Sequence, residues 1–181
     1  LQNISLPPNL LYIGMSAFEG CTSLGNFTLP SGLLYIDMQA FDECTGLTHM
    51  TFPSSVRTIG ESAFLKCVNL TEVTFPENSI AAIQSTAFQS TGLSSVYLPS
   101  GVTFTGYFDR PSEMQFGYIF IKVGHHTKMS DFKIITDSKD AAAYTYAKEN
   151  GFDVTVLIKN VDISGLAEPV INQTPSTSLV L

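Results

Sequence analysis

The chain has 181 residues, and it combines 44% hydrophobic residues with only 14% charged ones. This composition is typical of a globular protein with a sizeable core and excludes intrinsic disorder. The net charge of −7 disfavours nucleic-acid binding, because it repels phosphate backbones. No apolar run approaches the ~20 residues of a membrane-spanning helix. The sequence opens without a methionine, at the tail of a repeat, and we interpret it as a piece of a longer protein.

Residues 6–98 repeat one pattern four times, with a period of 23 residues. Each repeat begins with an apolar residue and a proline, and these apolar residues are Leu6, Leu29, Phe52, Phe75 and, at the start of a fifth repeat, Leu98. A fixed period in this range is typical of a solenoid, in which short units stack on one another. We therefore predict a β-rich solenoid over residues 1–121 that is degenerate from about residue 99.

Each repeat contains the pattern of one strand and one tight turn. The strand is expected where apolar residues alternate, for example at Leu47, Met50 and Phe52, and the following proline ends it. A helical or 3₁₀ turn is expected on the far side, around an Ala-Phe pair whose phenylalanine fills the core. These phenylalanines are Phe18, Phe41, Phe64 and Phe88. The fourth repeat gains a residue before Ile83 and loses one after Phe88, which keeps its strand in register.

The three cysteines, Cys21, Cys44 and Cys67, occupy one equivalent position in three successive repeats. Neighbouring coils lie about 4.8 Å apart, so distance alone does not exclude a disulfide, although three parallel side chains cannot all pair. We expect a ladder of small buried thiols that pack as hydrophobic groups, with a zinc or redox role as the alternative.

The C-terminal region is expected to cap the solenoid. Residues 116–121 still fit the strand frame of the repeats, and 107–115 are expected to be irregular. A cap over residues 122–158 would contain a strand at 132–136, a helix at about 138–150 that ends at Gly151, and a strand from Phe152 to Ile158. An open solenoid end exposes strand edge and core, which the cap would cover. Residues 159–181 are interpreted as a linker or the start of a following immunoglobulin-like module, or else as a strand that packs back on the cap.

The repeat pattern LPxxLxxIxxxAFxxCxxLxxxT resembles the leucine-rich repeats of the BspA-like type, found in bacterial surface proteins and some protozoan ones. The resemblance covers residues 1–98, and the segment AAAYTYAKENGF is similar to the one that often ends such arrays. It implies a leucine-rich-repeat solenoid in an extracellular or cell-surface protein that serves adhesion or host contact without catalysis. It implies nothing about which ligand is bound.

The open sheet face is the expected binding surface, because it carries two columns of strand residues that point away from the core. The candidate binding residues are Asn26, His49, Glu72, Tyr97, Tyr118 and Phe120. The second column also contains Thr28, Thr51 and Thr74, which sheet propensity alone would explain. The aromatic side chains at its end could form a ligand platform, but we expect the cap to bury them.

A second candidate surface is a contact patch of Leu11, Met15, Leu34 and Met38. The third repeat has Arg57 and Glu61 at these places, so the positions are expected to face water. Four apolar side chains there predict contact with a neighbouring repeat block, a second copy or a ligand. The alternative is that they are scattered surface residues of the ordinary kind.

The sequence contains no catalytic motif, and we predict no catalytic residue, no cofactor and no metal site. The His125-His126 pair is expected in a solvated loop; the alternative is a metal site with Glu113 or Asp131. We therefore predict a non-enzymatic module that binds a protein or glycan and does not insert into a membrane. A structural spacer is the alternative, and an enzyme with a site at 107–131 is a third hypothesis.

Overall fold

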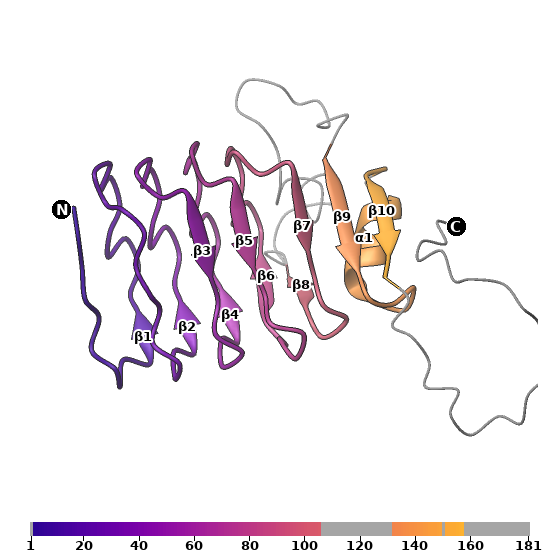
Figure 1. The fold of residues 1–181 in the computed structure, drawn as a ribbon, viewed down its shortest axis with the longest axis horizontal. Coiled ribbons are helices and arrows are strands. Elements are labelled where there is room, and N and C mark those ends of the chain that lie inside the picture. The colour runs from indigo at the N-terminus through magenta and orange to yellow at the C-terminus, as the bar shows by residue number, and fades with distance from the viewer. Residues whose placement is uncertain (1, 106–131, 150, 158–181) are drawn as a thin grey trace, which may run out of the picture.

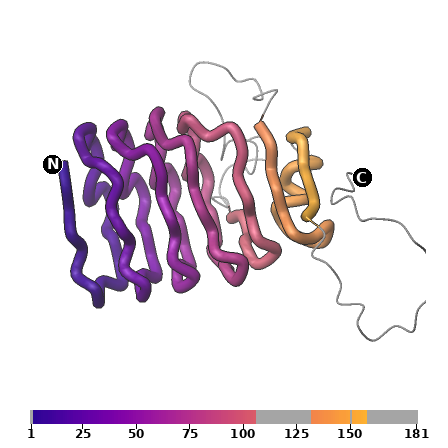
Figure 2. The backbone as a smooth tube through the Cα atoms, in the orientation of Figure 1, coloured from indigo at the N-terminus to yellow at the C-terminus, as the bar shows by residue number. Residues whose placement is uncertain are grey.

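The computed structural model describes residues 2–105, 132–149 and 151–157. From the N-terminal end, its backbone forms successive coils that stack along one axis, and a small β/α unit lies at the opposite end (Figures 1 and 2). The predicted solenoid with a C-terminal β/α cap is therefore confirmed.

Parallel strands line the solenoid on two sides. The open face, as predicted from the alternating residues, contains β3 (His49–Thr51) and β5 (Glu72–Thr74), which form one sheet, and β7 (Ser95–Tyr97), which forms a sheet with two strands of the cap. The other side is a single sheet, which we call the isoleucine sheet, and it contains β1 (Tyr12–Ile13), β2 (Tyr35–Ile36), β4 (Thr58–Ile59), β6 (Ala82–Gln84) and β8 (Thr103–Thr105), in this order. The sequence interpretation missed the isoleucine sheet, because β1, β2, β4 and β6 each have a single buried residue, an isoleucine, and one residue cannot show alternation.

The strands of the open face follow the predicted burial pattern. The central residues Met50, Val73 and Val96 are buried, and the residues on either side of Met50 and Val73 are exposed. In the first coil, residues 26–28 occupy the same place without forming a strand. After each strand a proline starts a tight turn; for example, the Val56 N–H donates to the Pro53 carbonyl at 3.2 Å. The proline lacks an N–H group and so cannot extend the strand pairing.

The far side of each coil is built from consecutive turns rather than the predicted helical or 3₁₀ turn. Hydrogen bonds of the 3₁₀ type do occur, such as the one from the Glu19 N–H to the Ser16 carbonyl at 3.2 Å. However, Ser16, Gln39, Ser62 and Thr86 have φ between 54° and 58°, which a right-handed helix does not accommodate. The positive φ angles leave every second N–H free to bond the next coil. Bonds between coils therefore fix this side, as strand pairing fixes the other two.

The core is organised by a stack of phenylalanine rings. Ring centroids are 5.1 Å apart for Phe18 and Phe41, 5.2 Å for Phe41 and Phe64, and 5.3 Å for Phe64 and Phe88. The three interplanar angles are 8°, 12° and 3°. The predicted column of rings inside a single coiled slab is confirmed.

The extra residue of the fourth coil is Ile80. Ser79 is buried and its N–H bonds the Pro76 carbonyl, as Val56 bonds Pro53 in the third coil. The isoleucine sheet then resumes with Ala82 paired to Thr58. Ile80, which is 52% exposed, therefore projects outward and leaves the pairing on both sides intact.

The cap continues the open face with β9 (Lys133–Thr136) and β10 (Asp153–Val156), which pair in parallel. β7 pairs directly with β9, so β9 is the strand beside β7. The predicted continuation of the strand frame at 116–121 lies outside the described residues and stays a prediction. Helix α1 (Ala142–Glu149) packs Tyr146 against Phe104, with ring centroids 4.7 Å apart. The helix begins a turn later than predicted, because Ser138 and Ala141 first close a tight turn.

Gly151 follows α1 with φ of 63° and ends the helix, as predicted. The predicted boundaries of the solenoid at residue 121 and of the cap at residue 158 stay predictions, because 106–131 and 158–181 lie outside the described residues. The interpretation of 159–181 as a linker or a following module also lies outside them.

Candidate functional site

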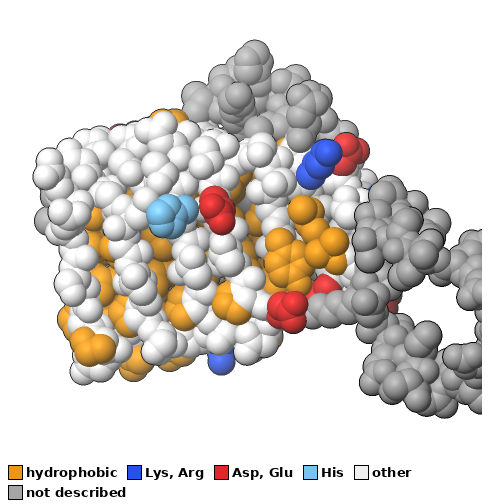
Figure 3. Space-filling model, viewed as in Figure 1, with side chains coloured by type: hydrophobic (Ala, Val, Ile, Leu, Met, Phe, Trp, Pro, Cys, Tyr) orange, Lys and Arg blue, Asp and Glu red, His pale blue; other side chains and the backbone are white. Residues whose placement is uncertain are grey.

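The open face presents its exposed side chains in register across neighbouring strands. His49 pairs with Glu72, and Thr51 pairs with Thr74. All four side chains are exposed, as predicted. Because the strands are parallel and lie about 4.8 Å apart, equivalent residues form straight columns. Figure 3 shows this face with few charged side chains over β3 and β5.

Asn26 has a structural contact that the sequence did not reveal. Its side-chain oxygen accepts hydrogen bonds from the N–H groups of Thr48 and His49, at 3.0 and 3.1 Å. Its amide nitrogen donates to the Thr48 hydroxyl at 2.7 Å. The exposed Asn26 side chain therefore fixes the backbone at the start of β3, including that of His49.

Tyr97 lies at the junction between the open face and the cap. It pairs with Ile135 of β9, is half-buried, and donates from its hydroxyl to the Asp137 carboxylate at 3.4 Å. The cap therefore covers Tyr97 only in part, and hydrophobic side chains gather over β7 and β9 in Figure 3. The predicted partners Tyr118 and Phe120 lie outside the described residues.

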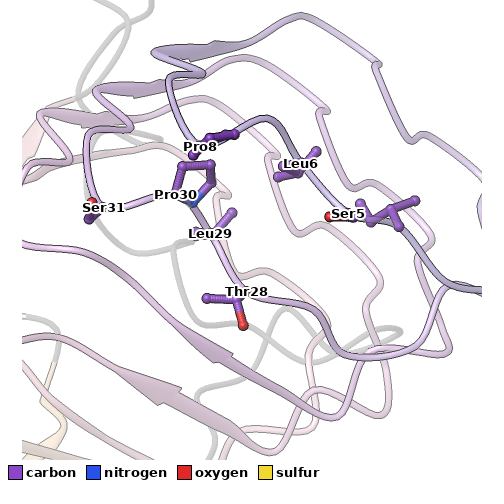
Figure 4. Close-up of a pocket in the computed structure, with 8 residues that line it drawn as sticks. Ser5, Leu6, Pro8, Thr28, Leu29, Pro30 and Ser31 are labelled. Carbon is purple, nitrogen blue, oxygen red and sulfur yellow. The ribbon is translucent and has the colours of Figure 1, made fainter.

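A groove of about 440 Å³ lies between the first two coils, at the corner where the open face meets the proline turn. Figure 4 shows Leu6 and Pro8 of one coil opposite Leu29 and Pro30 of the next. Ile4, Ser5, Thr28 and Ser31 complete its lining. The groove offers hydroxyl and apolar groups without a charged side chain, and it extends the open face towards the N-terminal end.

The predicted contact patch is placed on and beside the isoleucine sheet. Leu11 and Met15 are 53% and 59% exposed, whereas Leu34 and Met38 are half-buried. The sequence interpretation missed the two tyrosines that complete this surface. Tyr12 and Tyr35 are 52% and 43% exposed and lie beside each other on β1 and β2. The signal that could have found them is the Tyr-Ile pair in the first two repeats, which the third replaces with Thr-Ile.

Asp37 gives this second surface its charge. Its carboxylate accepts a hydrogen bond from the Tyr12 hydroxyl and another from the Met38 N–H at 2.7 Å. The hydrogen bond from Tyr12 and the negative charge of Asp37 raise the pKa of the Tyr12 hydroxyl above its ordinary value.

The cysteine ladder is part of the core. Cys44 and Cys67 are fully buried and Cys21 is half-buried; all three are free thiols. The Cys44 thiol donates to the Phe18 carbonyl, and the Cys67 thiol donates to the Phe41 carbonyl, each at 3.0 Å. Burial raises the pKa of the Cys44 thiol to about 12 and raises that of Cys67 further. These thiols pack as predicted, and thiols held protonated in this way are poor nucleophiles and metal ligands.

Within the described ranges, no group of three or more histidine, cysteine or acidic side chains could hold a metal ion. In the same ranges, no helix is both long and apolar enough to span a membrane. His125, His126 and the acidic residues proposed beside them lie outside the described part of the chain.

The sequence profile of the BspA type leucine-rich repeat region matches residues 1–108 in six copies. The chain belongs to the BspA-type leucine-rich repeat family. The resemblance seen in the repeat pattern is therefore confirmed, and the fold is that of a binding or structural module. A comparison with curated proteins finds no match.

Solved structures of two leucine-rich repeat proteins are similar to this chain. A leucine-rich cell surface protein from Faecalibacterium prausnitzii is 30% identical over 59% of the chain, with a TM-score of 0.51. A leucine-rich repeat protein from T. pallidum is 35% identical over 58%, with a TM-score of 0.54. The chain spans 29% of the length of the first protein and 51% of the second, so it corresponds to part of each.

Proposed function

We propose that this segment is a non-enzymatic binding module that works outside the cell or at the cell surface, and that its open face binds a protein or a glycan. Its membership of the BspA-type family supports this function, as does the similarity to a cell surface protein from F. prausnitzii. The candidate contact residues are Asn26, His49, Glu72, Tyr97, Tyr118 and Phe120.

The in-register exposed columns of the open face carry this proposal. His49 and Glu72 stand side by side on strands whose central residues are buried in the core. The backbone beneath them is fixed on both sides by hydrogen bonds between coils, so a ligand meets strands whose backbone is already ordered. Pre-ordering reduces the entropy cost of binding, and a long polar face with few charged side chains suits an extended ligand.

The experiment is a binding screen of the chain against extracellular matrix proteins and a glycan array. We expect His49→Ala and Glu72→Ala to weaken the binding of any ligand that the screen finds. Lys66→Ala is the matched control, because Lys66 is equally accessible but lies on the far-side turns, in an exposed ion pair with Glu43. Binding that falls only in the control variant would place the ligand away from the open face.

A structural spacer is the second candidate, and the stacking of the coils favours it. The N-terminal end and the cap lie at opposite ends of the stack (Figure 1), so each added coil lengthens the segment by about 4.8 Å. Replacing the second and third coils with unrelated coils of equal length discriminates between the two functions. Adhesion by the full-length protein survives this replacement in a spacer, but not where His49 and Glu72 make the contact.

A further inference from the structure

The exposed hydrophobic side chains of the solenoid are concentrated in its first two coils. Of the seven large hydrophobic side chains that are exposed among the described residues, four lie here: Leu11, Tyr12, Met15 and Tyr35. We call these four residues the tyrosine patch. In the third coil, the equivalent positions carry Arg57, Thr58 and Glu61. The first two coils therefore present an apolar surface where the next coil presents a polar one.

The exposure of Tyr35, the member of the tyrosine patch in the second coil, is not an effect of the end of the stack. Tyr35 is flanked on both sides, since it pairs with Tyr12 of β1 and with Thr58 of β4. It nevertheless remains 43% exposed. Its ring projects outward from the isoleucine sheet, and this orientation does not depend on whatever precedes the first coil.

The two tyrosine rings and Asp37 form a surface in which two inclined rings lie beside a negatively charged carboxylate. The ring centroids are 6.3 Å apart and the planes are inclined at 52°, so the pair forms a wedge rather than a closed stack. The Tyr12 hydroxyl and the Met38 N–H both donate to the Asp37 carboxylate. Asp37 is thus held in a fixed position next to the Tyr12 ring.

No ion pair between described residues involves Asp37; the salt bridge that they do contain joins Glu43 and Lys66. The cation of the neighbouring coil, Arg57, is directed elsewhere, because its guanidinium donates to the carbonyls of Ser54 and Ser55 at 3.1 and 2.8 Å. Among the described residues, the charge of Asp37 therefore has no cationic partner, in a chain whose net charge is −7.

We propose that the tyrosine patch and Asp37 form a second binding surface, for a protein segment that places a cationic side chain beside an apolar one. A lysine or arginine is attracted both by the face of a tyrosine ring and by a nearby carboxylate. Leu11 and Met15 supply the adjoining apolar contact. Tyrosine is also among the residues that dominate interface energies, because it buries a large area at a low entropy cost. This surface lies on the isoleucine sheet, so it is independent of the open face.

The test is a titration of the ¹⁵N-labelled chain with the blocked peptide Leu-Arg-Leu-Arg-Leu, followed by two-dimensional NMR. A matched peptide with citrulline in place of arginine keeps the shape and removes the charge. We expect saturable shift changes at residues 11–15 and 34–38, and binding of the citrulline peptide weaker by about fivefold. Asp37→Asn and Tyr35→Ala should each weaken the arginine peptide by a similar factor, whereas Thr58→Ala, the control on the same sheet, should not.

The chain must keep its circular dichroism spectrum in each variant, and Asp37→Asn is chosen because asparagine retains the acceptor for the Met38 N–H. Equal affinity for the two peptides, or an unchanged affinity in Asp37→Asn, would overturn the proposal. So would shift changes confined to the open face. Sedimentation of the free chain gives an independent check: self-association that Tyr35→Ala abolishes would assign the patch to a second copy instead.

Discussion

The ring of Phe88 lies 5.3 Å from the ring of Phe64, and the two planes differ by only 3°. This is the most nearly parallel pair in the phenylalanine stack, although its members are one residue further apart in the chain than Phe41 and Phe64. The outward projection of Ile80 absorbs the extra residue before the isoleucine sheet resumes. The repeat length changes by one residue here, but the rings remain stacked. This indicates that core packing constrains the structure of the coil more strongly than repeat length does.

Phe64→Ala should be among the most destabilising single substitutions in the chain. The ring is fully buried between Phe41 and Phe88 and also meets Phe52 edge-on, with centroids 5.7 Å apart. Truncation would leave a cavity and cost about 3–5 kcal/mol of the unfolding free energy, measured by urea unfolding. Phe18→Ala is the matched control: Phe18 is half-buried with the Phe41 ring on one side, so it should cost less. Equal losses would show that the end of the stack is as tightly packed as its middle.

Gly46 is expected to tolerate no side chain, because the preceding coil passes directly over it. A Cβ atom at this position would lie 2.6 Å from the Leu24 carbonyl oxygen and 2.9 Å from that of Thr22. These neighbours are backbone atoms, so relief requires the coils to separate. We expect Gly46→Ala to cost about 1–3 kcal/mol of unfolding free energy, measured by urea unfolding.

Gly32→Ala is the matched control for Gly46→Ala, because the atom nearest to its added Cβ would be a Leu11 side-chain carbon at 3.8 Å. This is an ordinary contact, and the change should fall within about 0.5 kcal/mol. If Gly46→Ala left the free energy of unfolding unchanged, the first two coils would be able to separate at this corner at little cost.

The sequence predicted the features that depend on the repeat period and on the alternation of apolar and polar residues. The phenylalanine stack and the buried Met50 and Val73 follow from residue type and spacing alone. The isoleucine sheet does not, because Tyr12-Ile13 becomes a strand only when the next coil supplies its partner. The positive φ angle at Ser16 has the same origin, since its N–H bonds the Met38 carbonyl of the following coil.

The strand beside β7 shows the limit of counting residues. A count of 23 residues from β7 leads to 116–121, which lie outside the described residues, whereas the strand that pairs with β7 is β9, at Lys133 and Ile134. Short alternating patterns are common, and only three-dimensional pairing selects among them. The tyrosine patch was recognised in part for a related reason: Leu11 and Met15 are conspicuous as apolar residues, whereas the exposure of Tyr12 and Tyr35 depends on the sheet that carries them.

The buried thiols provide a test of how tightly the coils are closed. Because the pKa of Cys44 is raised to about 12 and that of Cys67 is also raised, both thiols remain protonated and shielded in the folded chain at pH 8. We expect iodoacetamide to modify them only after unfolding in urea, as read by mass spectrometry of each peptide. Half-buried Cys21 is the internal comparison and should react first. Modification of Cys67 before Cys21 would indicate that the coils open in the middle of the stack.

The same thiols make stability depend on alkaline pH. The pKa of each buried thiol is higher in the folded chain than in the unfolded one, so the folded chain holds these protons more tightly. The stabilisation is complete below the unfolded value of about 8.5 and is lost as the pH rises towards the folded values. Urea midpoints measured between pH 7 and pH 10 should therefore fall above about pH 8.5. Cys44→Ser in combination with Cys67→Ser should flatten this decline, and an equally steep decline in the double variant would exclude the thiols as its cause.

The titration of Tyr12 reports whether Asp37 holds the tyrosine patch in solution. The hydrogen bond to Asp37 is the largest cause of the raised pKa of Tyr12, and the charge of Asp37 is a smaller one. Asp37→Asn removes the charge and keeps an acceptor, whereas Asp37→Ala removes both. We therefore expect the pKa of Tyr12 to be highest in the native chain, lower in Asp37→Asn and lowest in Asp37→Ala, as measured by NMR of tyrosine labelled with ¹³C at Cζ. An unchanged pKa in Asp37→Ala would show that the Tyr12 hydroxyl does not bond Asp37 in solution. The fixed carboxylate on which the second binding surface depends would then be absent, even if both tyrosine rings stay exposed.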